Sequence, residues 1–187
     1  MSALNAIQTM NNKIIRFFNY ESAFDFYTKK IKDVKQGNIK RSGIKKIAKP
    51  VLILSIIRGI ENGTFRYNRF LFEDLEDIYN SIFEQYATIA KQSEKTNIAY
   101  PLYYLQTDEL WHLNFHNHSE TRTASPSTAW VRRNVEYAYI DEELWLLLHN
   151  PDYRLRMKNF IIETKIKNVK VNHSPLIKQF IGWLLAI

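Results

Sequence analysis

The histidines are the side chains of this sequence best suited to metal binding or acid–base chemistry. His116 and His118 flank Asn117 in the stretch WHLNFHNHSE, and His112 lies just before them. In a histidine nuclease of the H-N-H type, one histidine acts as general base while others hold a divalent metal, and a ββα unit spreads them apart. Here the three letters are adjacent, and neighbouring residues of an extended chain point to opposite sides. We therefore interpret the match as a coincidence, predict no metal site, and expect His112 to be packed or hydrogen-bonded.

Other catalytic patterns are missing from the sequence. The five glycines are scattered and form no phosphate-binding loop, and no serine nucleophile elbow occurs. There is no cysteine, which excludes thiol catalysis, disulfides and cysteine-based metal centres. The sequence therefore predicts that the chain is not an enzyme and uses no cofactor.

Positive charge is concentrated in the first third of the chain. The formal net charge is +7, and residues 29–49 hold nine lysines and arginines against the single Asp33. Clustered cations attract polyanions, because each neutralised phosphate releases a counterion. This pattern predicts binding to double-stranded DNA, although a solvated lysine-rich surface is the alternative. The candidate DNA-contacting residues are Arg41, Lys45, Lys46, Lys49 and Arg132.

Hydrophobic periodicity predicts the elements that must position these residues. Helices are expected over residues 19–36, from Pro50 to Gly63, over 75–86, over 141–150 with Asp141 as N-cap, and from Pro151 with Asn150 as N-cap. The alternating, aromatic stretch Thr64–Phe72 predicts a strand, and the apolar runs 99–106 and 110–115 predict a hairpin. The expected fold is α+β and mostly helical, with a small antiparallel sheet or hairpin in a winged-helix-like arrangement.

The C-terminal end has a different composition from the rest of the chain. Residues Leu176–Ile187 are apolar but number too few to span a bilayer, which requires about 20 apolar residues. We therefore expect a recognition domain over residues 1–170 and an apolar tail or helix over 171–187, with no membrane span. The tail could dock onto a partner chain. The lack of cysteine favours a cytoplasmic location.

Three stretches resemble one family of DNA-recognition domains. They are IAKPVLILSIIRGIENG, YPLYYLQTDELWHL and YAYIDEELWLLLHNPDYRLRMKNFIIETKI, which together place the similarity over residues 24–166. The sequence is similar to the N-terminal sulfur-binding domain of HNH-type, modification-dependent restriction endonucleases, which recognise phosphorothioate-modified DNA. The most specific part is Asp141–Trp145 followed by Asn150, Pro151 and Arg154.

The resemblance implies a site and a function. Lys49, Tyr100, Pro101 and Tyr104 correspond to a shallow apolar cavity that takes the sulfur beside a cation. The chain departs from the family pattern at Ala48, at Tyr104 and at Asp108-Glu109, where a histidine, a small residue and Asp-Gly are usual. We expect a non-catalytic DNA-binding domain of a restriction or defence system, since the nuclease domain that would follow the matching segment is not expected in a chain of this length.

Two further functions remain open at this point. The chain could be a protein-interaction subunit, or a degenerate nuclease fragment, that docks through its apolar tail. A nuclease subunit acting in trans, or a second copy bound through Leu176–Ile187, is the expected protein partner.

Overall fold

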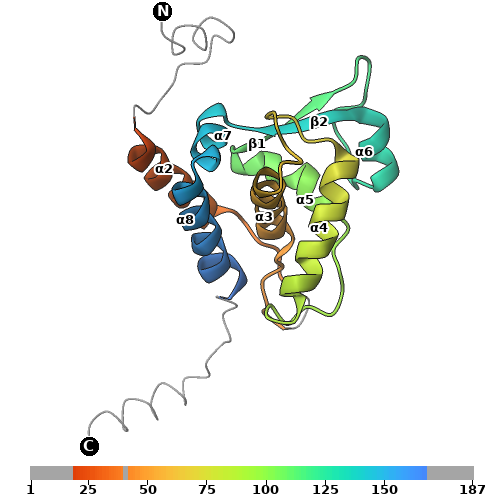
Figure 1. Cartoon of the computed structure of the whole chain (residues 1–187). Helices are drawn as coiled ribbons and strands as arrows, with labels where there is room; N and C mark the ends of the chain where they lie inside the picture. The colour runs from red at the N-terminus through yellow and green to blue at the C-terminus, as the bar shows by residue number, and fades with distance from the viewer. Residues whose placement is uncertain (1–18, 40–41, 168–187) are drawn as a thin grey trace, which may run out of the picture.

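The computed structural model describes residues 19–39 and 42–167. Its elements are α2 (Tyr20–Asp33), α3 (Ala48–Glu61), α4 (Phe72–Ala87), α5 (Ala99–Tyr104), the 3₁₀ turn η1 (Leu105–Asp108), β1 (Trp111–Phe115), α6 (Thr128–Asn134), β2 (Val135–Ile140), α7 (Glu142–His149), α8 (Pro151–Ile161) and the π-helical turn η2 (Ile162–Ile166). Figure 1 shows α3 in the middle of the molecule, with α4 and α8 on its two sides and the small sheet above it. The expected mostly helical α+β fold with a small antiparallel sheet is confirmed.

Helix α3 is the centre of the core. It is apolar on nearly its whole circumference, and Val51, Leu52 and Ile56 are buried. Pro50 lies in the first turn, where its missing N–H removes no helical hydrogen bond. Gly63 follows the last turn with φ of +77°, the left-handed conformation that commonly ends a helix. A helix buried on all sides fixes the positions of the elements around it.

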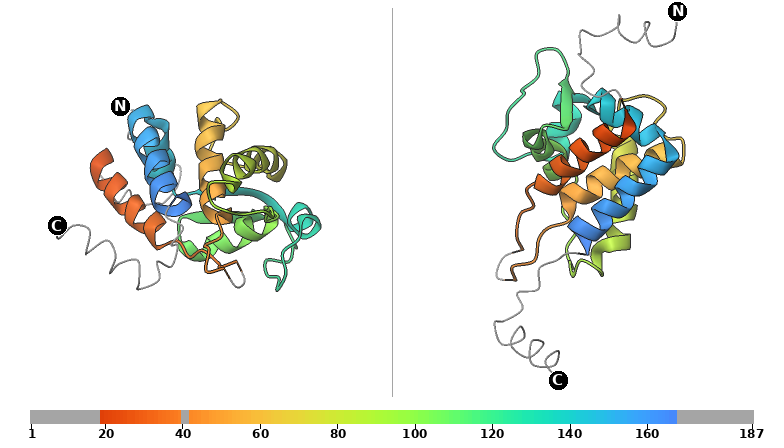
Figure 2. Two further views of the ribbon diagram at one scale, coloured as in Figure 1. Left: turned by 90° about the horizontal axis from the view of Figure 1, so that it is seen from below. Right: turned by 90° about the vertical axis from the view of Figure 1, so that its left-hand side faces the viewer.

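Helices α2 and α8 pack together at the edge of the molecule (Figure 2, left). Asn19 caps α2 by accepting a hydrogen bond from the Ser22 N–H, and Asn150 caps α8 in the same way through the Asp152 N–H. The predicted Asn150-Pro151 start of a helix is therefore confirmed. Arg156 of α8 forms two hydrogen bonds, of 2.7 and 2.9 Å, with the Glu21 carboxylate of α2.

The sheet contains two antiparallel strands that are distant in sequence. Trp111 pairs with Ile140 and Phe115 with Val135, and residues 116–134, including α6, connect the strands. The predicted hairpin between the runs 99–106 and 110–115 is wrong, because the first run folds as α5 and η1. Short apolar runs fit a strand or a buried helix equally well, and Pro101 is tolerated in a first helical turn.

The predicted strand Thr64–Phe72 is also absent from the described part of the chain. Phe70 alone forms a bridge, exchanging backbone hydrogen bonds of 2.8 and 2.9 Å with Ala138. Beside it, the Asn68 side chain bonds both the N–H and the C=O of Ile140. A side-chain amide thus takes the place of the backbone ladder that a strand would need.

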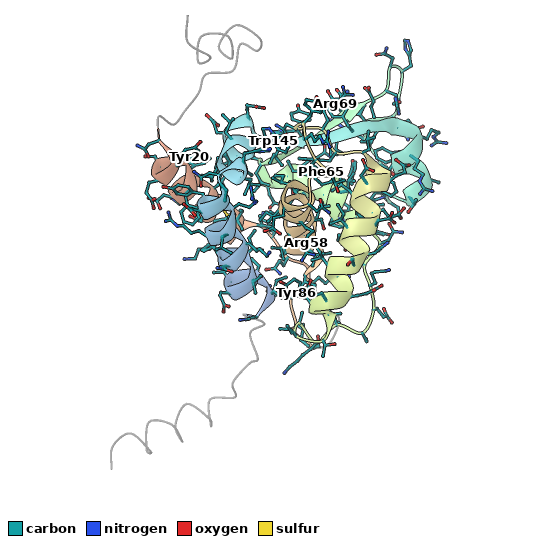
Figure 3. All side chains as sticks on the ribbon, in the orientation of Figure 1. Tyr20, Arg58, Phe65, Arg69, Tyr86 and Trp145 are labelled. Carbon is teal, nitrogen blue, oxygen red and sulfur yellow. The ribbon has the colours of Figure 1, made fainter. Side chains whose placement is uncertain are left out.

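Aromatic side chains fill the space between this segment and the sheet. The Phe70 ring lies 4.9 Å from that of Phe65 and 5.9 Å from those of Trp111 and Trp145. Figure 3 shows Phe65 and Trp145 close to the sheet end of α3. The alternating aromatics of 64–72 therefore form core contacts without forming a strand.

Two predictions on the ends of the chain stay untested. The boundary at residue 170 and the apolar tail Leu176–Ile187 both lie outside the described residues. Among the helices of residues 19–39 and 42–167, none has the length and apolar character needed to cross a membrane.

Candidate nucleic-acid interface

An open pocket of about 700 Å³ lies where the segment before α3 meets α5. Figure 2 (left) shows that segment, in orange, beside the green α5. The charged and aromatic residues of its lining are Lys35, Lys46, Lys49, Glu94, Lys95, Tyr100 and Tyr104, with Pro101 beside Tyr100. The pocket thus combines cations with aromatic rings, which is the composition that suits a partly apolar anion.

Helix α5 supplies the aromatic wall of the pocket. Tyr100 and Tyr104 are four residues apart, so the helix places them on one face. Their rings are stacked, with centroids 6.4 Å apart and planes at 23°. The exposed fractions of the two residues are 43% and 38%, whereas Pro101 between them is buried. Both tyrosine side chains are therefore accessible from the pocket.

The loop between β1 and α6 forms hydrogen bonds with the tyrosines at the outer edge of this wall. The Tyr104 hydroxyl donates a 3.3 Å hydrogen bond to the Ala124 carbonyl oxygen, and the Tyr103 hydroxyl accepts one of 3.1 Å from the Thr123 N–H. The rings of Tyr103 and Tyr104 also meet edge to face, with centroids 5.2 Å apart. Thr123 and Ala124, in the loop that follows β1, thus contact the side chains of Tyr103 and Tyr104 on α5.

Lys49 supplies the cation next to this wall, and it has a partner that the sequence analysis missed. Its ammonium nitrogen lies 2.5 Å from Asp108 Oδ2, and the exposed fractions of the two side chains are 15% and 7%. The other Asp108 oxygen accepts a 3.2 Å hydrogen bond from the Lys35 N–H. Asp108 matches the aspartate of the family's Asp-Gly pattern, and the departure from that pattern is at Glu109.

Two glutamines hold the basic segment that precedes α3. The Gln36 amide donates to the carbonyl oxygens of Lys46 and Lys165, at 3.0 and 3.1 Å. Gln92 is buried, and it donates to the Lys45 carbonyl oxygen while accepting from the Ile47 N–H. This segment therefore has fixed partners on the pocket side.

The Lys165 ammonium reaches the C-terminal end of α2. It donates to the carbonyl oxygens of Lys32 and Val34 at 2.6 and 3.0 Å. Burial lowers the pKa of Lys165, while the nearby carboxylates of Asp33 and Asp108 act in the opposite direction. Lys165 therefore stabilises the backbone that leads into the pocket.

Among the other residues predicted to contact DNA, some line the pocket and others do not. Lys46 is exposed and lines the pocket, whereas Lys45 is half-buried and does not. Arg132 lies outside the pocket lining, where it pairs with Glu73 at 3.4 Å and Glu76 at 3.1 Å. Arg41 lies outside the described residues.

His112 belongs to a hydrogen-bonded network in the fold. Its Nε2 lies 2.7 Å from Asp141 Oδ1, and its ring stacks on Tyr139 at 4.9 Å, which confirms that it is packed and hydrogen-bonded. The Tyr27 hydroxyl donates to Asp141 and to Glu143, both at 3.1 Å, and burial raises the pKa of Tyr27. Asp141 occupies the predicted N-cap position of α7 but makes no capping hydrogen bond, because its carboxylate is used by this network.

The remaining histidines form no metal cluster with neighbouring ligands in the part of the chain that the structure describes. His116 donates its backbone N–H to the Asn134 carbonyl oxygen at 2.9 Å, and His118 has φ of +62°. Both positions belong to the turn that begins the loop after β1.

Comparison with known proteins identifies the family to which this chain belongs. Residues 27–180 match the model of the ScoMcrA-like DNA sulfur-binding domain, so the chain belongs to that family. The resemblance inferred from the three sequence stretches is thereby confirmed.

Two solved structures share the fold. The sulfur-binding domain of SprMcrA, complexed with phosphorothioated DNA, has a TM-score of 0.60 at 16% identity, covering 90% of this chain and 99% of that one. The corresponding ScoMcrA complex has a TM-score of 0.58 at 16% identity, covering 86% of this chain and 98% of the other. No curated protein matches the chain.

Proposed function

We propose that this chain binds duplex DNA and prefers a backbone in which sulfur replaces one non-bridging phosphate oxygen. The observation that carries the proposal is the meeting of Lys49, Tyr100, Pro101 and Tyr104 at one open pocket. These four residues come from two segments that are far apart in sequence. The family membership and the two similar domains complexed with phosphorothioated DNA support the same ligand.

The chemistry of the pocket suits such a ligand. Sulfur is larger and more polarisable than oxygen and is less strongly hydrated, so contact with a ring face or a proline edge costs it less desolvation free energy. The ring of Tyr100 and the edge of Pro101 supply that contact, and the ring of Tyr104 stacks on that of Tyr100 at the pocket. Lys46 and Lys49 are placed to hold the negative charge of the same group or of its neighbours.

A competition experiment tests this function. A labelled duplex with one phosphorothioate is bound to the full chain and displaced by unlabelled duplexes of identical sequence, with and without the sulfur. We expect the sulfur-containing competitor to displace the label at a lower concentration. Equal displacement by the two competitors contradicts the sulfur preference, and failure of both to bind contradicts the DNA-binding function.

We further propose that the domain recognises DNA without cutting it. It would then act with a nuclease, in trans or through a further domain, in a cytoplasmic restriction system of the HNH-associated kind. The pairing of His112 with Asp141 supports this role, because it commits that imidazole to the fold.

A cleavage assay tests whether the domain binds DNA without cutting it. The full chain, incubated with modified or plain duplex and magnesium, manganese or zinc, is expected to leave the DNA intact. Metal-dependent cleavage that disappears in a His116→Ala/His118→Ala double variant would assign a catalytic role to that pair and contradict the proposal.

A further inference from the structure

Asp108 lies next to the pocket and pairs with Lys49, a cation of the pocket lining. The Asp108 carboxylate is 2.5 Å from the Lys49 ammonium, yet Asp108 itself is not part of the pocket lining. Lys49 and the two tyrosines are therefore open to a ligand, whereas Asp108 contacts the pocket only through Lys49.

The position of Asp108 couples the cation to the aromatic wall. Asp108 ends η1, which continues directly from α5, so it follows Tyr104 by one helical turn. Its second carboxylate oxygen accepts a hydrogen bond from the backbone N–H of Lys35, a residue of the pocket lining. One carboxylate thus links the ring-bearing helix, the start of α3 and the segment after α2.

The ion pair also changes the electrostatics of the pocket. Lys49 and Asp108 together carry no net charge, and both side chains are largely buried, with exposed fractions of 15% and 7%. A phosphate oxygen that approaches Lys49 must compete with a carboxylate that already accepts its hydrogen bond. Compact oxygen anions lose most from this competition, because they depend on charged hydrogen bonds to replace their hydration.

We propose that Asp108 is a specificity-determining residue, which neutralises Lys49 so that the pocket discriminates against ordinary phosphodiesters. The apolar contact with Tyr100 and Pro101 then decides binding and favours the less hydrated sulfur. The proposal rests on the proposed function, since it concerns the ligand of the same pocket. It assigns Asp108 a positioning role and no direct contact with DNA.

The test compares Asp108→Asn with wild type on plain and phosphorothioate duplexes. The amide removes the negative charge and keeps a similar shape. We expect affinity for plain DNA to rise by about five- to tenfold and affinity for modified DNA by about twofold, so the preference for sulfur falls. The log–log salt slope should steepen by about one for plain DNA, because a freed cation neutralises one more phosphate.

The neighbouring residue offers a matched control. Glu109→Gln makes the same change of net charge one position away, where the carboxylate pairs with Lys30 and the Glu109 side chain is 82% exposed. Glu109 does not line the pocket. We expect this variant to leave the ratio of the two affinities unchanged, and an equal gain in both variants would overturn a specific role for Asp108.

A second variant separates the charge effect from a loss of structure. Asp108→Asn is also introduced into the Lys49→Met variant, which lacks the cation. We expect the double variant to bind plain and phosphorothioate duplexes with affinities within about twofold of those of Lys49→Met alone. A parallel fall of both affinities in Asp108→Asn, or no change in either affinity, overturns the proposal.

The wild-type protein distinguishes this proposal from the proposed function. If wild type binds the two duplexes equally, the proposed function fails, while a gain of plain-DNA binding by Asp108→Asn still establishes the masking of Lys49.

Discussion

Tyr100 and Tyr104 form two halves of one surface, yet they should contribute differently to recognition. Tyr100 lies next to the buried Pro101 in the first turn of α5, whereas Tyr104 is bonded to Ala124 at the outer edge. A sulfur that rests against a ring gains about 0.3–1.5 kcal/mol. The difference between the two tyrosines can therefore be measured as a change in the ratio of two affinities.

We expect Tyr100→Ala to reduce the preference for phosphorothioate DNA by about two- to tenfold, which is that contact energy expressed as an affinity ratio. Tyr104→Ala should raise the preference, because the family usually has a small residue there and the ring narrows access to the wall. Competition binding on plain and modified duplexes measures both effects. Tyr67→Ala is the control, since Tyr67 is 77% exposed and outside the pocket lining. An unchanged ratio in both pocket variants would show that the rings serve packing alone.

At the scale of elements, the position of α3 depends on a close approach between Gly59 and Phe65. A Cβ atom added to Gly59 would lie 2.1 Å from Phe65 Cδ2. Phe65 in turn packs against Phe70, which bridges to β2. Gly59 therefore allows the segment after α3 to fold back against the helix and reach the sheet.

Gly59→Ala is expected to destabilise the fold. In a free helix this change would stabilise by about 0.8–1 kcal/mol. Here the Phe65 ring must move within a packed core, an overpacking that typically costs about 1–3 kcal/mol. Urea denaturation measures the net loss. Gly37→Ala is the control, because its nearest contact would be Lys46 Cδ at 3.8 Å. A Gly59→Ala variant as stable as wild type would contradict the close packing.

The contact between α2 and α8 predicts a pH dependence. Hydrogen bonds from Arg156 and Tyr153 lower the pKa of Glu21 from 4.5 to about 2. Because the folded-state pKa is depressed, the contact stabilises the fold above pH 4.5 and loses this contribution as the pH falls towards 2. Glu21→Gln should therefore be less stable than wild type at pH 7, with the difference shrinking below pH 4.5.

Urea unfolding at several pH values tests this contact. Glu84→Gln is a matched control, because Glu84 belongs to a longer, exposed pair with Lys95 at 3.6 Å. That variant should differ little from wild type at any pH. If Glu21→Gln and Glu84→Gln behave alike, the bidentate Arg156 contact contributes nothing to stability.

The whole molecule carries a formal net charge of +7, which predicts strongly salt-dependent DNA binding. If about five phosphates are contacted, the log–log slope of affinity against salt is about −4 to −5, so that raising salt from 50 to 200 mM weakens binding by about 500-fold. Fluorescence anisotropy at several salt concentrations measures the slope. Arg132→Ala should leave it nearly unchanged, because Glu73 and Glu76 already neutralise Arg132. Salt-independent binding would contradict the electrostatic role of the charge.

The sequence by itself determined much of this protein. Periodic apolar residues predicted most of the long helices, and the Asn150-Pro151 pair predicted the start of α8, because caps and helical faces depend on local spacing. Family resemblance then selected Lys49, Tyr100, Pro101 and Tyr104 from segments about 50 residues apart. The resemblance implied one cavity for these four residues, and all four line one pocket in the structure.

The tertiary structure decided which local preferences prevailed. The run from Ala99 to Gln106 fits a strand as well as a helix, and its contact with α3 accompanies the helical form that stacks Tyr100 on Tyr104. The stretch before Phe72 alternates like a strand, but the Asn68 side chain replaces its backbone pairing. Lys49 looked like a lone cation until Asp108 was placed beside it. Contacts between residues distant in sequence determine these three features, and the spacing of residues along the chain does not predict such contacts.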